Sequence, residues 1–169
     1  DRSGDWTFHA EFDLGTASIE ILGHDFDGDG ATDIVWGMGH AYGLHWLRQS
    51  RDAAGKRVWT KADIDTSFSQ VHTLHLGDFD GDRELEFVTG KRIYAHASEP
   101  GATDHPCIFL FKFDRKAGKW VKTVVYQGDP APNAPADAER RDALQDFPRG
   151  SAGTGLQMAL RDLDQDGDL

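Results

Sequence analysis

Short apolar runs alternate with turn residues along the chain, and this pattern predicts β-strands. The runs are five to seven residues long, too short for most helices, and no 3.6-residue apolar periodicity passes through them. We predict two groups of four strands: Ser18–Leu22, Asp33–Gly37, Gly43–Arg48 and Trp59–Ile64, then Val71–Leu76, Leu85–Thr89, Cys107–Phe113 and Trp120–Tyr126.

The turns between these runs predict how each group of strands is connected. An Asp-rich stretch separates the first run from the second in both groups, and the turns at 52–55 and 115–118 separate the third from the fourth. Four-stranded antiparallel sheets that recur every ~40–50 residues are typical of propeller blades. The pattern therefore predicts an all-β chain, a β-propeller built of four-stranded antiparallel blades.

Tryptophan and aspartate positions give the repeat its register. Trp6 precedes Asp25 by 19 residues, Trp59 precedes Asp78 by the same distance, and the two pairs are 53 residues apart. Trp120 precedes Asp162 by 42 residues, so the third unit carries an insertion. The sequence from 127 to 153 is rich in Pro, Ala, Asp and Gly, as expected of an exposed loop.

We therefore expect the chain to be a piece of a larger propeller. Its predicted parts are an outer strand of a preceding blade (1–16), two blades (17–65 and 66–126), an inserted loop (127–153) and the start of a further blade (154–169). Two blades cannot close a ring, because propellers have about four to eight. We expect the remaining blades in the same natural chain.

The Asp-rich stretches are candidate calcium sites. Their carboxylates fall at positions 1, 3, 5 and 9 of a glycine-containing turn, which suits a hard cation that prefers many oxygen ligands. The alternative, a turn without metal, stays open mainly for the second stretch, where Arg83 replaces the glycine of position 6. EF-hand loops are excluded, because position 12 is Trp36 or Thr89 instead of an acid. The predicted ligands are Asp25, Asp27, Asp29, the Ala31 carbonyl and Asp33; Asp78, Asp80, Asp82, Glu84 and Glu86; and Asp162, Asp164, Asp166 and Asp168.

The composition argues against a nucleic-acid partner and a membrane span. The net charge is −11, and the three stretches hold 13 of the 29 acidic residues, so much of the charge belongs to candidate metal sites. The sequence has no basic stripe for nucleic acid and no apolar run near the ~18 residues of a membrane span.

The stretch DFDGDGATDI at 25–34, its copy at 78–87 and the Trp register resemble FG-GAP/VCBS-type repeats. The resemblance implies calcium-binding blades of a β-propeller, often seven-bladed, of which this chain covers about two blades and parts of their neighbours. The segments 69–74 and 88–96 resemble a subgroup that includes the propeller domain of aldos-2-ulose dehydratase. This narrower resemblance implies a carbohydrate ligand and lyase or dehydratase chemistry.

Strand topology places a second group of candidate residues at the end of each blade opposite the acidic turns. His72 is prominent, because the equivalent positions in the other units hold Ile19 and Leu156. We predict His72, Lys91, Arg92, Tyr94 and His96 as catalytic residues and His40, Tyr42 and Gln70 as substrate-binding residues. Zinc or another divalent metal near His72 and His96 is a further hypothesis, since imidazoles are common zinc ligands. A hydrogen-bonded structural role for His72 is an equal alternative.

Three functions remain open at this stage. The chain belongs to a carbohydrate lyase or dehydratase, to a non-catalytic propeller that binds glycans or proteins in adhesion, or to a calcium-stiffened spacer. For all three we expect an extracellular or periplasmic location.

Overall fold

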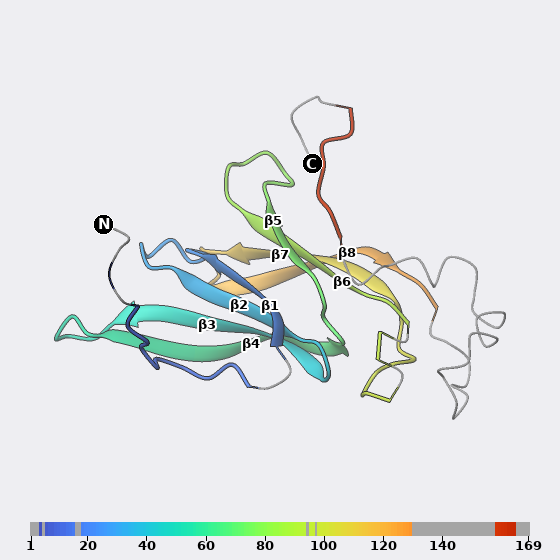
Figure 1. Ribbon diagram of the computed structural model, residues 1–169. Coiled ribbons are helices and arrows are strands. Elements are labelled where there is room, and N and C mark those ends of the chain that lie inside the picture. Colours follow the sequence, from blue (N-terminus) through green and yellow to red (C-terminus); the bar gives the residue numbers. More distant parts are fainter. Residues whose placement is uncertain are drawn as a thin grey trace.

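A computed structural model describes residues 4, 6–15, 18–93, 95–96, 98–129 and 158–164. Within these residues, eight strands form two four-stranded sheets (Figure 1). The first sheet contains β1 (Ser18–His24), β2 (Asp33–Met38), β3 (Tyr42–Arg51) and β4 (Arg57–Ser69). The second contains β5 (Leu74–Gly77), β6 (Glu86–Lys91), β7 (Cys107–Asp114) and β8 (Lys119–Gln127).

Both sheets follow the predicted topology. Their strands are antiparallel and lie in sequence order, and the two acidic turns join β1 to β2 and β5 to β6. The prediction of an all-β chain with two four-stranded antiparallel sheets is confirmed, and this arrangement is consistent with two propeller blades. The largest shift in bounds is in β4, which continues to Ser69, five residues past the predicted end.

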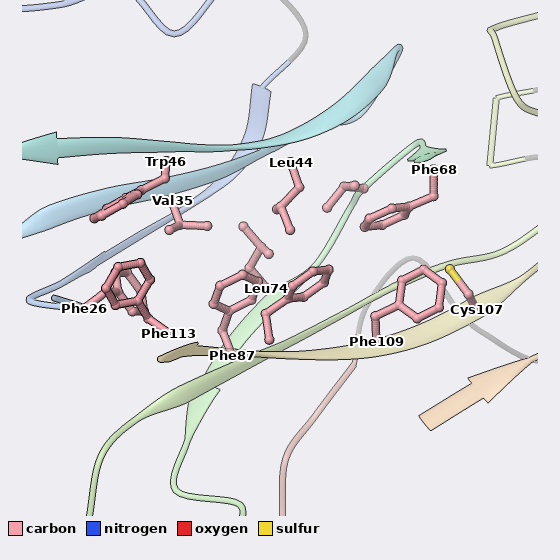
Figure 2. Packing of buried hydrophobic residues seen from close by; sticks show 12 residues of the cluster. Phe26, Val35, Leu44, Trp46, Phe68, Leu74, Phe87, Cys107, Phe109 and Phe113 are labelled. Atoms are coloured by element: carbon pink, nitrogen blue, oxygen red, sulfur yellow. The ribbon is translucent and has the colours of Figure 1, made fainter. Parts of the chain in front are cut away.

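The main core lies between the two sheets, which face each other as neighbouring blades do. Figure 2 shows Val35, Leu44 and Trp46 of the first sheet directed toward Phe87 and Phe109 of the second. In β7, burial alternates strictly along the strand, because successive side chains of a strand point to opposite faces.

A tryptophan on the fourth strand of each sheet packs against the part of the chain that comes before that sheet. Trp120 on β8 packs edge-on against Phe26 and Trp46 of the first blade, with ring centroids 5.1 and 5.8 Å apart. Trp59 on β4 packs in the same manner against Phe12, at 5.0 Å. Residues 6–15 thus occupy the place next to β4, although the structure has no strand there, where an outer strand was expected.

Several predicted features lie outside the described residues. These are Tyr94, residues 130–153 of the inserted loop, residues 154–157 of the next blade, and Asp166 and Asp168 of the third acidic stretch. Among the described residues, no helix is long and apolar enough to cross a membrane.

Candidate functional site

The first acidic loop (residues 25–33) wraps its backbone around the Asp25 carboxylate. The backbone N–H groups of Gly28, Asp29 and Gly30 donate to the two Asp25 oxygens over 2.9–3.1 Å. Gly28 and Gly30 have φ values of 77° and 87°, a region that L-residues with side chains rarely adopt. The two glycines therefore permit the tight turn that gathers the carboxylates.

Three carboxylates of this loop converge. Asp25, Asp27 and Asp29 each offer an oxygen, and these oxygens lie within 4.8 Å of one another. Such a group of hard oxygen ligands fits a divalent cation of the calcium type. The structure thus brings together three of the five predicted ligands. The Ala31 carbonyl stays a predicted ligand.

Asp33, at position 9, is buried behind this group. Its side chain is 0% exposed, and its Oδ1 accepts the backbone N–H of Gln49 at 2.9 Å. Its Oδ2 has no hydrogen-bond partner in the described part of the chain. Burial raises the pKa of Asp33 to about 6, and the negative charges of Asp27 and Asp29 add to that effect. A cation in the loop would relieve both causes, so the residues present fit the metal.

The second acidic loop (residues 78–86) has the same fold with a different ligand set. The backbone N–H groups of Gly81 and Arg83 donate to Asp78 at 2.8 and 3.0 Å, and Arg83 adopts a φ of 72° without being glycine. The ligand atoms that lie within 4.8 Å of one another come from Asp78, Asp80 and Glu86. Glu86 occupies position 9 and is 1% exposed.

The other predicted ligands of the second loop, Asp82 and Glu84, lie outside this group and pair with cations of the chain. Glu84 pairs with Arg115 at 2.7 Å, and Asp82 pairs with Lys112 at 2.5 Å. In the third stretch, only Asp162 and Asp164 fall within the described residues, and no group of three ligand atoms found there includes either. Metal binding by the third stretch stays a prediction.

Three histidines meet at the opposite end of the blades, and we call them the histidine cluster: His40, His72 and His96. They come from the β2–β3 turn, the β4–β5 connection and the β6–β7 loop. The rings of His40 and His96 stack with centroids 4.0 Å apart, and the His72 ring lies 4.7 Å from His96 and 6.4 Å from His40. Residues separated by up to 56 positions in sequence are therefore side by side.

His72 is held as a neutral ring within this cluster. Burial lowers its pKa from 6.5 to about 4, and the neighbouring His96, His40 and Arg92 add to the shift, against a hydrogen bond to the Gly39 backbone. Burial also lowers the pKa of His96. Because His72 bonds to a carbonyl through one nitrogen, its other nitrogen, Nε2, is left with the lone pair. That Nε2 is buried and accepts no hydrogen bond from the described residues.

The cluster does not form a ready zinc site. Zinc needs lone pairs from three or four ligands converging at ~2 Å, whereas His40 and His96 present ring faces to each other. A set of three ligand atoms within 4.8 Å is found in the described residues only at the two acidic loops. Zinc near His72 and His96 stays a hypothesis that requires the rings to turn.

Gln70 and Lys91 support the histidine-bearing loop from beneath. Gln70 is 0% exposed, adopts a φ of 55°, and donates its amide to the carbonyl of His96 at 3.0 Å. Lys91 is 1% exposed and donates to the Gly101 carbonyl at 2.5 Å. Burial lowers the pKa of Lys91, although Asp104 and Cys107 oppose the shift. Both side chains hold loop carbonyls in place in this structure. Their contacts with substrate stay predictions.

Tyr42 reaches the surface beside this region and is tied to an acid. Its hydroxyl donates to Asp104 at 2.5 Å, and this hydrogen bond, with burial, raises the pKa of Tyr42 to about 12. Tyr42 is therefore protonated at neutral pH and suits hydrogen bonding or ring stacking better than proton abstraction. Glu99, 3.8 Å from His40, was missed by sequence reasoning, because no local pattern distinguishes it from other loop acids.

Fold and site together are typical of propeller blades with an acidic turn between the first and second strands. Comparison with known families agrees, since residues 25–89 match the family described as FG-GAP-like repeat. The match runs from the first ligand of the first loop to β6. Searches of curated proteins and of solved structures each returned no match. The narrower resemblance to aldos-2-ulose dehydratase propellers therefore has no named relative to support it.

The left-handed backbone at Arg83 leads to a stability prediction. An L-residue in this region costs about 1–2 kcal/mol, partly offset by the lower chain entropy of a non-glycine residue when unfolded. We expect Arg83→Gly to raise the free energy of unfolding by about 0.5–1 kcal/mol. Gly30→Ala, with φ 87° and no atom within 4 Å of the new Cβ, should lower it by a similar amount. Urea denaturation measures both, and a less stable Arg83→Gly variant would show that the arginine side chain supports the loop.

The neutral state of His72 leads to a pH prediction. Because the pKa falls from 6.5 to about 4 on folding, the ring contributes its full stabilisation above pH 6.5 and loses it as the pH falls toward 4. Solvent screens part of this effect, so we expect about 1–2 kcal/mol. His72→Gln should therefore lose less stability than the parent between pH 7.5 and 4.5 in urea denaturation. The exposed His9→Gln variant is the control, and equal losses in all three proteins would contradict the prediction.

Proposed function

We propose that this chain is part of a calcium-stabilised FG-GAP propeller and that calcium binds at the first acidic loop. The observation that carries this proposal is the convergence of Asp25, Asp27 and Asp29 in front of the buried Asp33. The three converging carboxylates repel one another, the charges of Asp27 and Asp29 also act on Asp33, and a divalent cation removes the repulsion. Calcium is favoured over magnesium because a flexible loop of many oxygens does not impose an octahedron.

Calcium removal tests this function. We expect excess EDTA to lower the melting temperature of the chain and added calcium to restore it. Asp25→Asn should remove most of the calcium response, because Asp25 both offers a ligand and organises the turn. Asp13→Asn, an exposed acid outside the loops, is the matched control. A melt that does not change with EDTA or calcium would refute the proposal.

For the face opposite the acidic loops, we propose binding of a carbohydrate. Tyr42 offers a half-exposed ring and a protonated hydroxyl, and His72 of the histidine cluster offers an imidazole whose lowered pKa keeps it neutral at pH 7. An aromatic ring beside hydrogen-bonding groups suits a sugar, which has apolar ring faces and polar edges. Long loops on a rigid sheet are also where binding residues concentrate. An extracellular or periplasmic location belongs to this proposal, because weak calcium sites fill at extracellular concentrations.

Lyase or dehydratase chemistry is the second candidate, and His72 favours it. Its Nε2 lone pair is free to take a proton next to a carbonyl, and the nearby Arg92 supplies a positive charge for an enolate. A base with a pKa of about 4 is weak at neutral pH, so binding without chemistry is the better supported of the two. Protein adhesion at the same face is the remaining alternative.

A glycan array with neutral and acidic oligosaccharides separates these candidates. We expect binding that Tyr42→Ala and His96→Ala weaken at least tenfold and that His9→Ala leaves unchanged. Incubation of a bound sugar with the chain, followed by mass spectrometry for loss of water, tests for chemistry. Product formation abolished by His72→Gln would establish the lyase, and product only with added zinc would establish the metal. No glycan binding by the folded, calcium-loaded chain would refute the carbohydrate proposal.

A further inference from the structure

The two acidic loops each face a basic residue that lies at the same place in the sheet. In the first blade Ile34 pairs with Leu47, which sets Asp33 beside Arg48. In the second blade Phe87 pairs with Phe111, which sets Glu86 beside Lys112. A cation on the third strand therefore stands opposite position 9 of each loop. The two cations differ in what they reach.

The Lys112 ammonium lies inside the second loop. Its Nζ is 2.6 Å from Asp80 Oδ2, 2.5 Å from Asp82 Oδ2 and 3.1 Å from Glu86 Oε1. Two of these acids belong to the group of three that would hold a metal ion. Among the described residues, Glu86 Oε1 accepts no hydrogen bond from any other group. The ammonium thus contacts the carboxylates that a divalent cation would need.

Arg48 pairs with two acids of the first loop but does not reach position 9. It pairs through Nε with Asp27 Oδ2, and its Nη2 lies 3.7 Å from Asp29. Among the residues described, Arg48 forms no ion pair with Asp33, and the buried Asp33 Oδ2 has no hydrogen-bond partner. The guanidinium is planar and bulky, whereas an ammonium is a compact point charge that fits among converging oxygens. In the first loop, the buried Asp33 therefore has no countercharge from the described residues in contact with it, unlike Glu86 in the second loop.

The electrostatics of the second loop agree with this difference. Burial alone would lower the pKa of Lys112, but hydrogen bonds to Asp80, Asp82 and Glu86 raise it well above the usual value. The carboxylates that Lys112 contacts thus favour its charged form. A divalent cation would have to displace a tethered competitor that already contacts three carboxylates.

We infer that the Lys112 ammonium takes the place of the divalent cation in the second loop, so that this FG-GAP-like blade is fastened without metal while the first loop binds calcium. The statement about the first loop rests on the proposed function. The statement about the second loop depends on Lys112 alone. It also predicts that removal of the ammonium uncovers a latent calcium site made of Asp78, Asp80 and Glu86.

Calcium stoichiometry, measured by isothermal titration calorimetry and by terbium luminescence, tests the inference. In the parent chain, we expect Asp80→Asn to leave the number of bound ions unchanged. Lys112→Gln should bind one ion more than the parent, and Lys112→Gln with Asp80→Asn should lose that ion. The exposed Lys116→Gln should gain none. Each comparison is made within one loop, so ions bound at the third stretch do not affect the result.

Thermal melts give a second measurement if Lys112→Gln folds poorly without metal. We expect its melting temperature to fall below that of the parent in EDTA and to rise more on calcium addition, because the new ion replaces the lost ammonium. Loss of an ion from the parent on Asp80→Asn, or no gained ion in calcium-folded Lys112→Gln, would overturn the inference. An unchanged ion count in Asp25→Asn would instead refute calcium at the first loop, so the two failures are distinguishable.

Discussion

The structure depends on a buried carboxylate at the start of the second strand of each blade. Asp33 is 0% exposed and Glu86 is 1% exposed, each next to two further acids of its loop. Burying an ion costs several kcal/mol unless a countercharge lies close by. Each blade must therefore supply or recruit a cation at that point. The two blades differ at this point, because Lys112 pairs with the buried Glu86, whereas Arg48 pairs with Asp27 and not with the buried Asp33.

The sequence predicted the strands and loops well, because they follow from local rules. Period-two burial, glycine turns and the repeat spacing all act over a few residues, and the eight observed strands overlap the predicted ones. Arg83 stands where the first loop has a glycine, and the structure gives it a positive φ. These features need no knowledge of how strands pair across a sheet.

The contacts that decide the sites could not be predicted, because they depend on strand register. Lys112 lies 26 residues after Glu86, and nothing in its own surroundings marks it as a ligand of the loop. The burial of Lys91 is similar, since Lys91 and Arg92 look alike in sequence while only Lys91 ends up inside. The histidine cluster was expected at one end of the blades, but the stacking of His40 on His96 follows from loop shape. The end of the blades that holds the histidines could thus be predicted from the sequence, whereas the contacts between their side chains depend on strand register and loop shape.

Arg115 connects the two loops and gives the acidic end of the blades a common structure. Its Nη1 pairs with Glu84 at 2.7 Å, and its Nε donates to the Phe26 carbonyl at 3.2 Å. It also lies so close to Gly28 that a Cβ there would come within 3.1 Å of the guanidinium. A shift in the first loop must therefore move a side chain that is paired with the second. Since Lys112 contacts three acids of the second loop, Arg115 links the first loop to a loop whose acids already have a countercharge within the chain.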